Sequence, residues 1–168
     1  MIILPAFSLA GCGVYSFTGA NITAETISIQ QFYNDAEGGP PDMPQTFTNK
    51  LKDYYLSNTN LGMVDEDGEL QLEGSITGYR LTPIAPTASD NDVLGGNTSA
   101  LTRLTITVQV TYVNTEDDQF NFENKSFSFY SDFDSDQNLT AIEATLLDEI
   151  FDQIILDIFN ASVANCNF

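Results

Sequence analysis

Residues 104–112 read LTITVQVTY, and this stretch decides the fold because its alternation is unbroken. Every second position is apolar or aromatic, and the positions between are threonine or glutamine. A period of two, rich in β-branched residues, is typical of a strand that buries one face and leaves the other polar. We therefore expect a sheet with one covered face and one polar face.

Similar patterns lie on both sides of this stretch. Residues 70–77 alternate in the same way, with Gly74 and Gly78 on the apolar side, where a glycine leaves space for a large neighbour or marks a bulge. A tight Asp-Gly turn at 65–68 precedes them, after a short apolar piece around Met63. A first strand is predicted at 26–32, and residues 83–99 are predicted to form a long loop.

The aromatic residues of the last predicted strand change sides. Phe120 and Phe122 share one parity, whereas Phe127 and Phe129 share the other. The strand must therefore contain a bulge near Asn124 or carry aromatic residues on both faces. The second arrangement would expose an aromatic patch.

Two segments have helical spacing. Pro44 suits a first helical turn, and the apolar residues that follow it predict a short amphipathic helix that ends between residues 57 and 60. From Thr140 onward a wide apolar stripe faces an acidic one, which predicts a long amphipathic helix. Thr140 and Glu143 have the spacing of a capping box at its start.

The element order is strand, helix, three strands, helix. This β-α-β-β-β-α order predicts an α+β fold, a four-stranded sheet with two helices packed on one face. We expect a single domain at residues 25–165, because a chain of 168 residues suffices for one hydrophobic core. The other face of the sheet is then available to a partner.

The composition excludes several function classes. With 24 acidic and five basic residues the formal charge is −19, so nucleic acid is not an expected partner. The chain has no histidine, and its two cysteines are Cys12 and Cys166, which leaves no basis for the commonest proton-transfer and nucleophilic sites. We therefore expect a binding or assembly protein and not an enzyme.

The amino terminus has the pattern of a lipoprotein signal. A short apolar run is followed by Ala10-Gly11-Cys12, so residues 1–11 are interpreted as a signal peptide, Cys12 as the acylated residue and residues 12–24 as a tether. The run lacks the usual positive charge, which indicates a truncated or misassigned start; the alternative is a buried strand that ends in a free cysteine. Gly13 after the cysteine favours the outer membrane.

An acidic loop is the strongest candidate metal site. Asp132, Asp134 and Asp136, with Glu143 further on, have roughly the spacing of a calcium loop that leads into a helix. Gln137 stands where such a loop needs glycine, and the preceding element is a strand instead of a helix. The alternative is a solvated acidic turn before the helix.

The few basic residues are the candidate contacts for anions. Arg80 ends one predicted strand and Arg103 begins the next, so a hairpin would bring them together as a local basic spot. Lys125 lies on the following strand.

Taken together, these segments resemble the lipopolysaccharide-assembly (LptE-like) lipoprotein family. The resemblance covers nearly the whole mature chain and rests on residues 11–17 (GCGVYSF), 26–29 (TISI), 74–79 (GSITGY) with Pro83, 103–108 (RLTITV) and the acidic helix after residues 127–134. It implies a lipid-anchored domain in the outer membrane, facing the periplasm, that plugs a large β-barrel translocon protein and helps it to assemble.

The resemblance also implies that basic residues contact lipopolysaccharide, for which Arg80, Arg103 and Lys125 are the candidates. The strongly acidic composition departs from that expectation, although divalent cations could bridge two anionic surfaces. The alternative function is a stand-alone periplasmic or surface lipoprotein that binds calcium or a small ligand.

Overall fold

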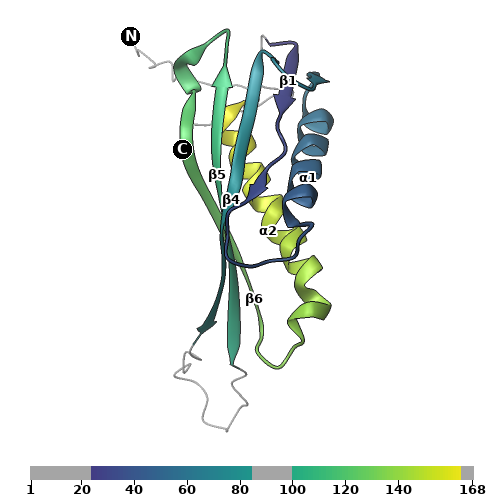
Figure 1. Cartoon of the computed structure of the whole chain (residues 1–168), viewed down its shortest axis with the longest axis vertical. Helices are drawn as coiled ribbons and strands as arrows, with labels where there is room; N and C mark the ends of the chain where they lie inside the picture. Colours follow the sequence, from purple (N-terminus) through teal and green to yellow (C-terminus); the bar gives the residue numbers. More distant parts are fainter. Residues whose placement is uncertain (1–23, 85–99, 164–168) are drawn as a thin grey trace, which may run out of the picture.

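The computed structural model describes residues 24–84 and 100–163. The elements are strands β1 (Thr26–Ile29) and β2 (Tyr33–Asn34), helix α1 (Met43–Asn58), strands β3 (Gly62–Val64), β4 (Leu70–Ile84) and β5 (Leu101–Asn114), a short 3₁₀ turn at Asp118–Phe120, strand β6 (Phe122–Asp134) and helix α2 (Leu139–Ser162). Long strands run the length of the molecule, and both helices lie on one side of them (Figure 1).

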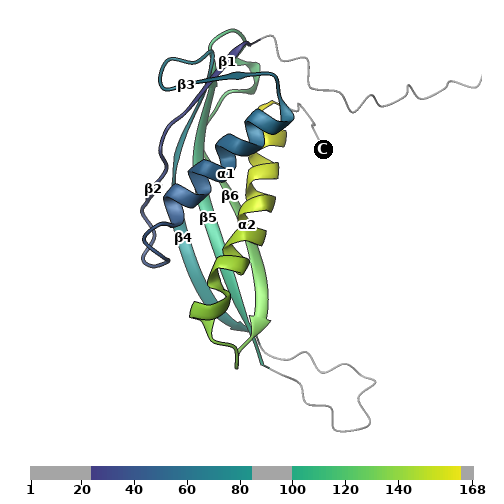
Figure 2. The same cartoon turned by 90° about the vertical axis from the view of Figure 1, so that its right-hand side faces the viewer.

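The strand order of the sheet is β3-β1-β4-β5-β6, with β2 paired to β4 beyond the end of β1. β1 runs parallel to β3 and to β4, whereas β4, β5 and β6 form an antiparallel meander. The fold is α+β with both helices on one face, as the sequence indicates (Figure 2). Within residues 24–84 and 100–163, no helix covers the opposite face of the meander.

The predicted number of strands, four, is wrong, since residues 24–84 and 100–163 alone contribute six strands to the sheet. The short apolar piece around Met63 pairs with β1 as a strand of its own. The predicted strand at 26–32 stops at Ile29, and the chain rejoins the sheet four residues later as β2. Phe32 lies in the break and is buried in the core, which explains the interruption.

The core lies between the sheet and the helices. One face of α1 contributes Met43, Phe47, Leu51 and Tyr55 at intervals of four residues. Helix α2 contributes a broader apolar face, and the buried side of the sheet completes the core. The alternating apolar residues of β5 are all buried: Leu104, Ile106, Val108, Val110 and Tyr112. Residues 104–112 thus form the strand with one buried face that the alternation predicts.

Two bulges place the side chains of the meander. The register between β4 and β5 shifts between Ile76 and Gly78, as the glycine positions suggest. A second shift in β6 coincides with Asn124, whose φ is +51°. It moves Phe127 onto the buried face, so the bulge near Asn124 is confirmed.

The predicted capping box of α2 is wrong. The helix begins at Leu139, and the side chain of Asn138 accepts the hydrogen bond from the Thr140 backbone N–H at 3.0 Å. Glu143 does not reach back to the helix start, because its carboxylate accepts a hydrogen bond from the Tyr79 hydroxyl on β4. Asparagine is as good an N-cap as threonine, and the observed N-cap lies two residues before the expected one.

Candidate binding surface

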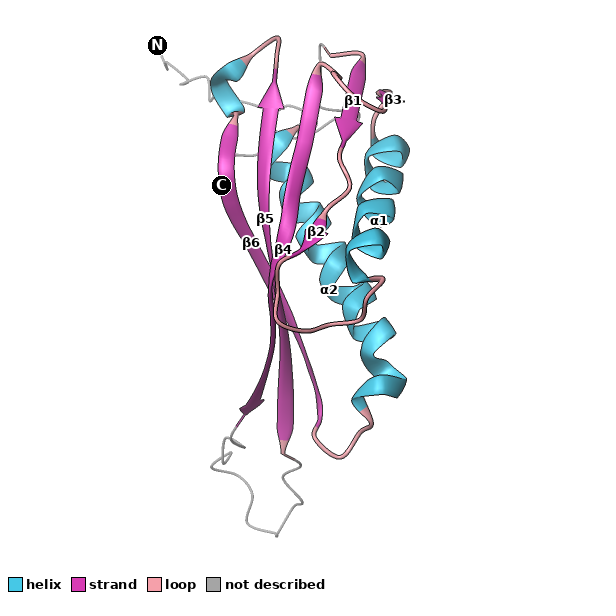
Figure 3. Cartoon of the chain, in the orientation of Figure 1, coloured by secondary structure: helices cyan, strands magenta, loops and turns pink. Residues whose placement is uncertain are grey.

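The face of the meander away from the helices is the candidate binding surface. It carries the polar residues that alternate with the core, including Thr105, Thr107 and Gln109 of β5 and their neighbours on β4 and β6. Figure 3 shows the long strands with both helices beside them. No helix in the described ranges combines the length and apolarity that a membrane span needs.

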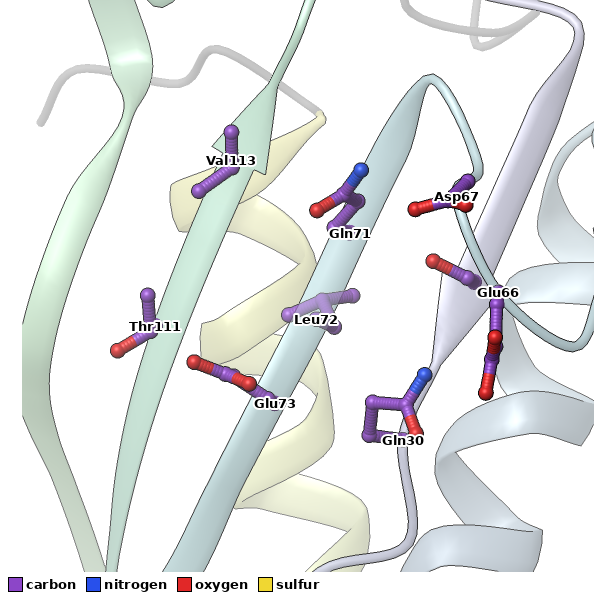
Figure 4. Close-up of a pocket in the computed structure, with 9 residues that line it drawn as sticks. Gln30, Glu66, Asp67, Gln71, Leu72, Glu73, Thr111 and Val113 are labelled. Carbon is purple, nitrogen blue, oxygen red and sulfur yellow. The ribbon is translucent and has the colours of Figure 1, made fainter.

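A depression of about 350 Å³ lies at one end of this surface. Figure 4 shows Glu66 and Asp67 from the turn beside Gln71 and Glu73 of β4 and Thr111 and Val113 of β5. The turn is fixed locally: Asp67 has a φ of +54°, and the Gln71 side-chain amide donates to the Gly68 carbonyl at 3.0 Å. The lining is mostly polar and acidic, unlike the largely apolar pockets that enclose small ligands.

Arg103 forms the best-defined charged contact of the surface. Its guanidinium donates to both carboxylate oxygens of Asp132, at 2.7 and 2.8 Å, and lies 3.5 Å from the centre of the Tyr130 ring. Hydrogen bonding to Arg103 lowers the pKa of the Asp132 carboxyl. This bidentate and stacked geometry is specific to arginine.

The register brings two of the three candidate anion contacts onto one face. Arg80 pairs with Thr105, and Arg103 pairs with Thr82, so the two arginines are diagonal neighbours across β4 and β5. Lys125 is not with them. It pairs with the inward-facing Val110, and its ammonium lies 5.2 and 5.4 Å from the ring centres of Phe122 and Phe127.

Two of the four candidate calcium ligands have other partners. Asp132 is bound to Arg103 on the open face, and Glu143 accepts a hydrogen bond from Tyr79 on the helix side. Within residues 24–84 and 100–163, no three carboxylate, cysteine or histidine groups are placed to hold a metal ion. Calcium binding by Asp132, Asp134, Asp136 and Glu143 stays a prediction, which calorimetry on the native chain and an Asp132→Asn/Asp134→Asn variant would test.

Sequence reasoning missed two parts of this surface. Tyr130 was not singled out, because its contact with Arg103 depends on the register of β5 and β6. The acidic depression combines residues from four separate segments, which the pairing of β1 and of β5 with β4 brings together. The proximity of Arg80 and Arg103 could be predicted from the sequence, because both residues lie near the ends of clearly predicted strands.

A profile of the LptE lipopolysaccharide-assembly family matches residues 24–162. The match covers well over half of the chain. The chain belongs to this family. A comparison with curated protein sequences finds no significant match.

Solved structures share the fold of this family member. A minor lipoprotein from Acinetobacter baumannii superposes with a TM-score of 0.52 at 13% identity, covering 86% of this chain and 96% of that one. A hypothetical protein from Chlamydia trachomatis also gives 0.52, at 11% identity, covering 84% and 99%. At such identities the likeness concerns the fold alone. Cys12, the predicted acylation site, lies outside the described residues.

Proposed function

We propose that the chain is an outer-membrane lipoprotein that acts as the plug and assembly subunit of a lipopolysaccharide-transport β-barrel complex, and not as an enzyme. The observation that carries this proposal is the family match, because residues 24–162 include every helix and strand of the described domain. The role is one of assembly, so it requires surfaces for other molecules and no reacting groups.

The surface chemistry supports a protein partner. The uncovered side of the meander is broad and rich in hydroxyl and amide groups, which suit the many hydrogen bonds of a polar interface. A charge of −19 opposes adsorption of the domain onto anionic lipids. In this proposal the acyl chains on Cys12 hold the protein at the membrane, on its periplasmic side.

The proposal includes direct contact between the chain and lipopolysaccharide. Arg80 is exposed, and among the described residues no carboxylate lies within ion-pair distance of it. Arg103 is held by Asp132, so an anion would have to compete with that carboxylate or share the guanidinium. Arg80 is therefore the proposed first contact for a phosphate, and divalent cations would bridge phosphates to the neighbouring acidic groups.

The test is isolation of the complex from membranes. The full chain with a carboxy-terminal tag is extracted in mild detergent, and its partners are quantified by mass spectrometry. We expect a large outer-membrane β-barrel protein in a one-to-one ratio. As a control, residues 1–23 are fused to an unrelated soluble domain, which we expect to recover no barrel. A chain that elutes alone from native membranes would contradict the proposal.

A further inference from the structure

Strand β6 forms one edge of the sheet. It is last in the strand order, and in the described part of the chain it pairs only with β5 (Figure 3). An edge strand offers unpaired backbone N–H and C=O groups to any extended segment that reaches it. The backbone groups of β6 that are not bonded to β5 therefore decide which segment can pair with this edge.

One hydrogen bond fixes the phase of the β5–β6 ladder. The Ser135 N–H donates to the Ala100 carbonyl at 2.9 Å, and the pairing continues without a shift from Asp134 opposite Leu101 to Lys125 opposite Val110. Hydrogen-bonded pairs alternate with non-hydrogen-bonded pairs in an antiparallel ladder. The backbone groups that point away from β5 therefore belong to the even positions: Ser126, Ser128, Tyr130, Asp132 and Asp134. Of these groups, the Asp134 carbonyl already accepts a hydrogen bond from the Gln137 N–H at 3.0 Å.

The two ends of this edge differ in their protection. At its start, β6 has the bulge at Asn124 and the charged Lys125 on the inward parity, which are devices that discourage strand pairing. Residues 126–134 (SFSFYSDFD) contain no proline, lysine or arginine, and their register is unbroken. Apart from the Asp134 carbonyl, this nine-residue part of the edge is open to pairing.

An aromatic pair marks the middle of the open edge. Phe129 and Tyr130 follow each other in the chain, yet their rings stack with centres 5.7 Å apart and planes 21° apart. They are 36% and 45% exposed. Because neighbouring side chains of a strand leave the backbone on opposite faces, the two rings can stack only by meeting at the edge of β6, where the Tyr130 ring also lies against Arg103. An added strand would cover both rings.

We propose that residues 126–134 of β6 bind an extended, basic segment of the β-barrel subunit by strand addition. The inference rests on the proposed function for the identity of the partner. Asp132 is already paired with Arg103, but Asp134 lies on the same edge and has no ion pair among the described residues. In a chain with a charge of −19, lysine or arginine in the added segment is therefore complementary. The same charge disfavours a second copy of this chain.

The test removes one outward-pointing N–H. Ser128→Pro deletes a donor that does not bond to β5, so the ladder within the sheet is preserved. Ser128→Ala is the matched control, because it loses the same hydroxyl contacts with Thr107 and the Ile106 carbonyl but keeps the N–H. Ser126→Pro and Ser126→Ala provide a second pair if Ser128→Pro does not fold. The readout is recovery of the barrel subunit with each full-length variant.

We expect Ser128→Ala to recover the barrel as the native chain does and Ser128→Pro to recover at least tenfold less. A photo-crosslinking residue in place of Tyr130 should join to a barrel peptide that contains lysine or arginine. Equal recovery with both variants overturns the inference but leaves the proposed function intact; no recovery with the native chain refutes both. A dimer of the chain alone that Ser128→Pro abolishes would assign the edge to a second copy and overturn the inference.

Discussion

Gly74 is a residue that the packing of β4 requires to be glycine. A Cβ atom there would lie 2.1 Å from the Gln109 carbonyl oxygen on β5 and 2.7 Å from the Phe32 ring. Because the oxygen belongs to the neighbouring strand, relief requires the backbone to move. We expect Gly74→Ala to lower the free energy of unfolding by about 1–3 kcal/mol, as overpacking does, measured by urea denaturation.

Gly62 in β3 is the matched control. Its added Cβ would meet only the Glu25 carbonyl oxygen, at 3.6 Å, which is ordinary contact. We expect Gly62→Ala to change the unfolding free energy by less than about 0.5 kcal/mol. Equal losses for the two variants would contradict the crowding around Gly74.

The buried tyrosines predict a loss of stability in alkali. Burial raises the pKa of the Tyr112 hydroxyl to about 12, and burial also raises the pKa values of Tyr55 and Tyr79. An unfolded tyrosine ionises near pH 10, so the stabilisation is complete below pH 10 and is lost as the pH rises toward 12. We expect Tyr112→Phe to remove part of this loss, on the order of 2 kcal/mol, in urea titrations from pH 9 to pH 12. Tyr33→Phe, at an exposed site, should lose as much stability between pH 9 and pH 12 as the native chain does. If the stability of Tyr112→Phe also fell in parallel with that of the native chain, the assignment to Tyr112 would be contradicted.

Single residues could be predicted from the sequence where the pattern is local. Gly74 lies on the apolar parity of its strand, and the change of aromatic parity requires either the bulge at Asn124 or exposed rings on both faces. The contact between Arg103 and Asp132 could not be predicted, because it depends on the register between β5 and β6, 29 residues apart in the chain. Sequence periodicity predicts which face of the sheet a residue lies on, but not which residue of the neighbouring strand it pairs with.

The start of α2 provides a prediction at the level of the element. Asn138 caps the helix, whereas Thr140 has no side-chain hydrogen bond within the described part of the chain. We expect Asn138→Ala to lower the unfolding free energy by about 1 kcal/mol and Thr140→Ala to have a much smaller effect. Thermal unfolding of both variants measures this. A larger loss for Thr140→Ala would support the capping box and contradict the structure.

The long elements could be predicted, and the short ones could not. Residues 70–77, 104–112 and the apolar stripe after Thr140 have a period that persists over several turns or pleats. β2 and β3 have two and three residues, too few for any period, and tertiary pairing with β4 and β1 alone defines them as strands. Asn138 was missed because both Asn138 and Thr140 are good caps and only the backbone of the loop selects one.

The attachment of the whole molecule depends on Cys12 in our proposal. We expect Cys12→Ser to move the protein from the membrane fraction to the soluble periplasmic fraction, because the acyl chains are lost. The domain itself should keep its thermal stability, since the described core starts at Ala24. Membrane retention of the serine variant would contradict the lipid anchor. Mass spectrometry of the native amino terminus gives an independent check.

The central claim is that this acidic family member serves lipopolysaccharide assembly. Its most direct measurement is depletion of the chain from its own cells, followed by quantification of lipopolysaccharide at the cell surface. We predict that surface lipopolysaccharide falls as the protein is depleted and that the native chain, but not an empty vector, restores it. Unchanged surface lipopolysaccharide after complete depletion would contradict the account.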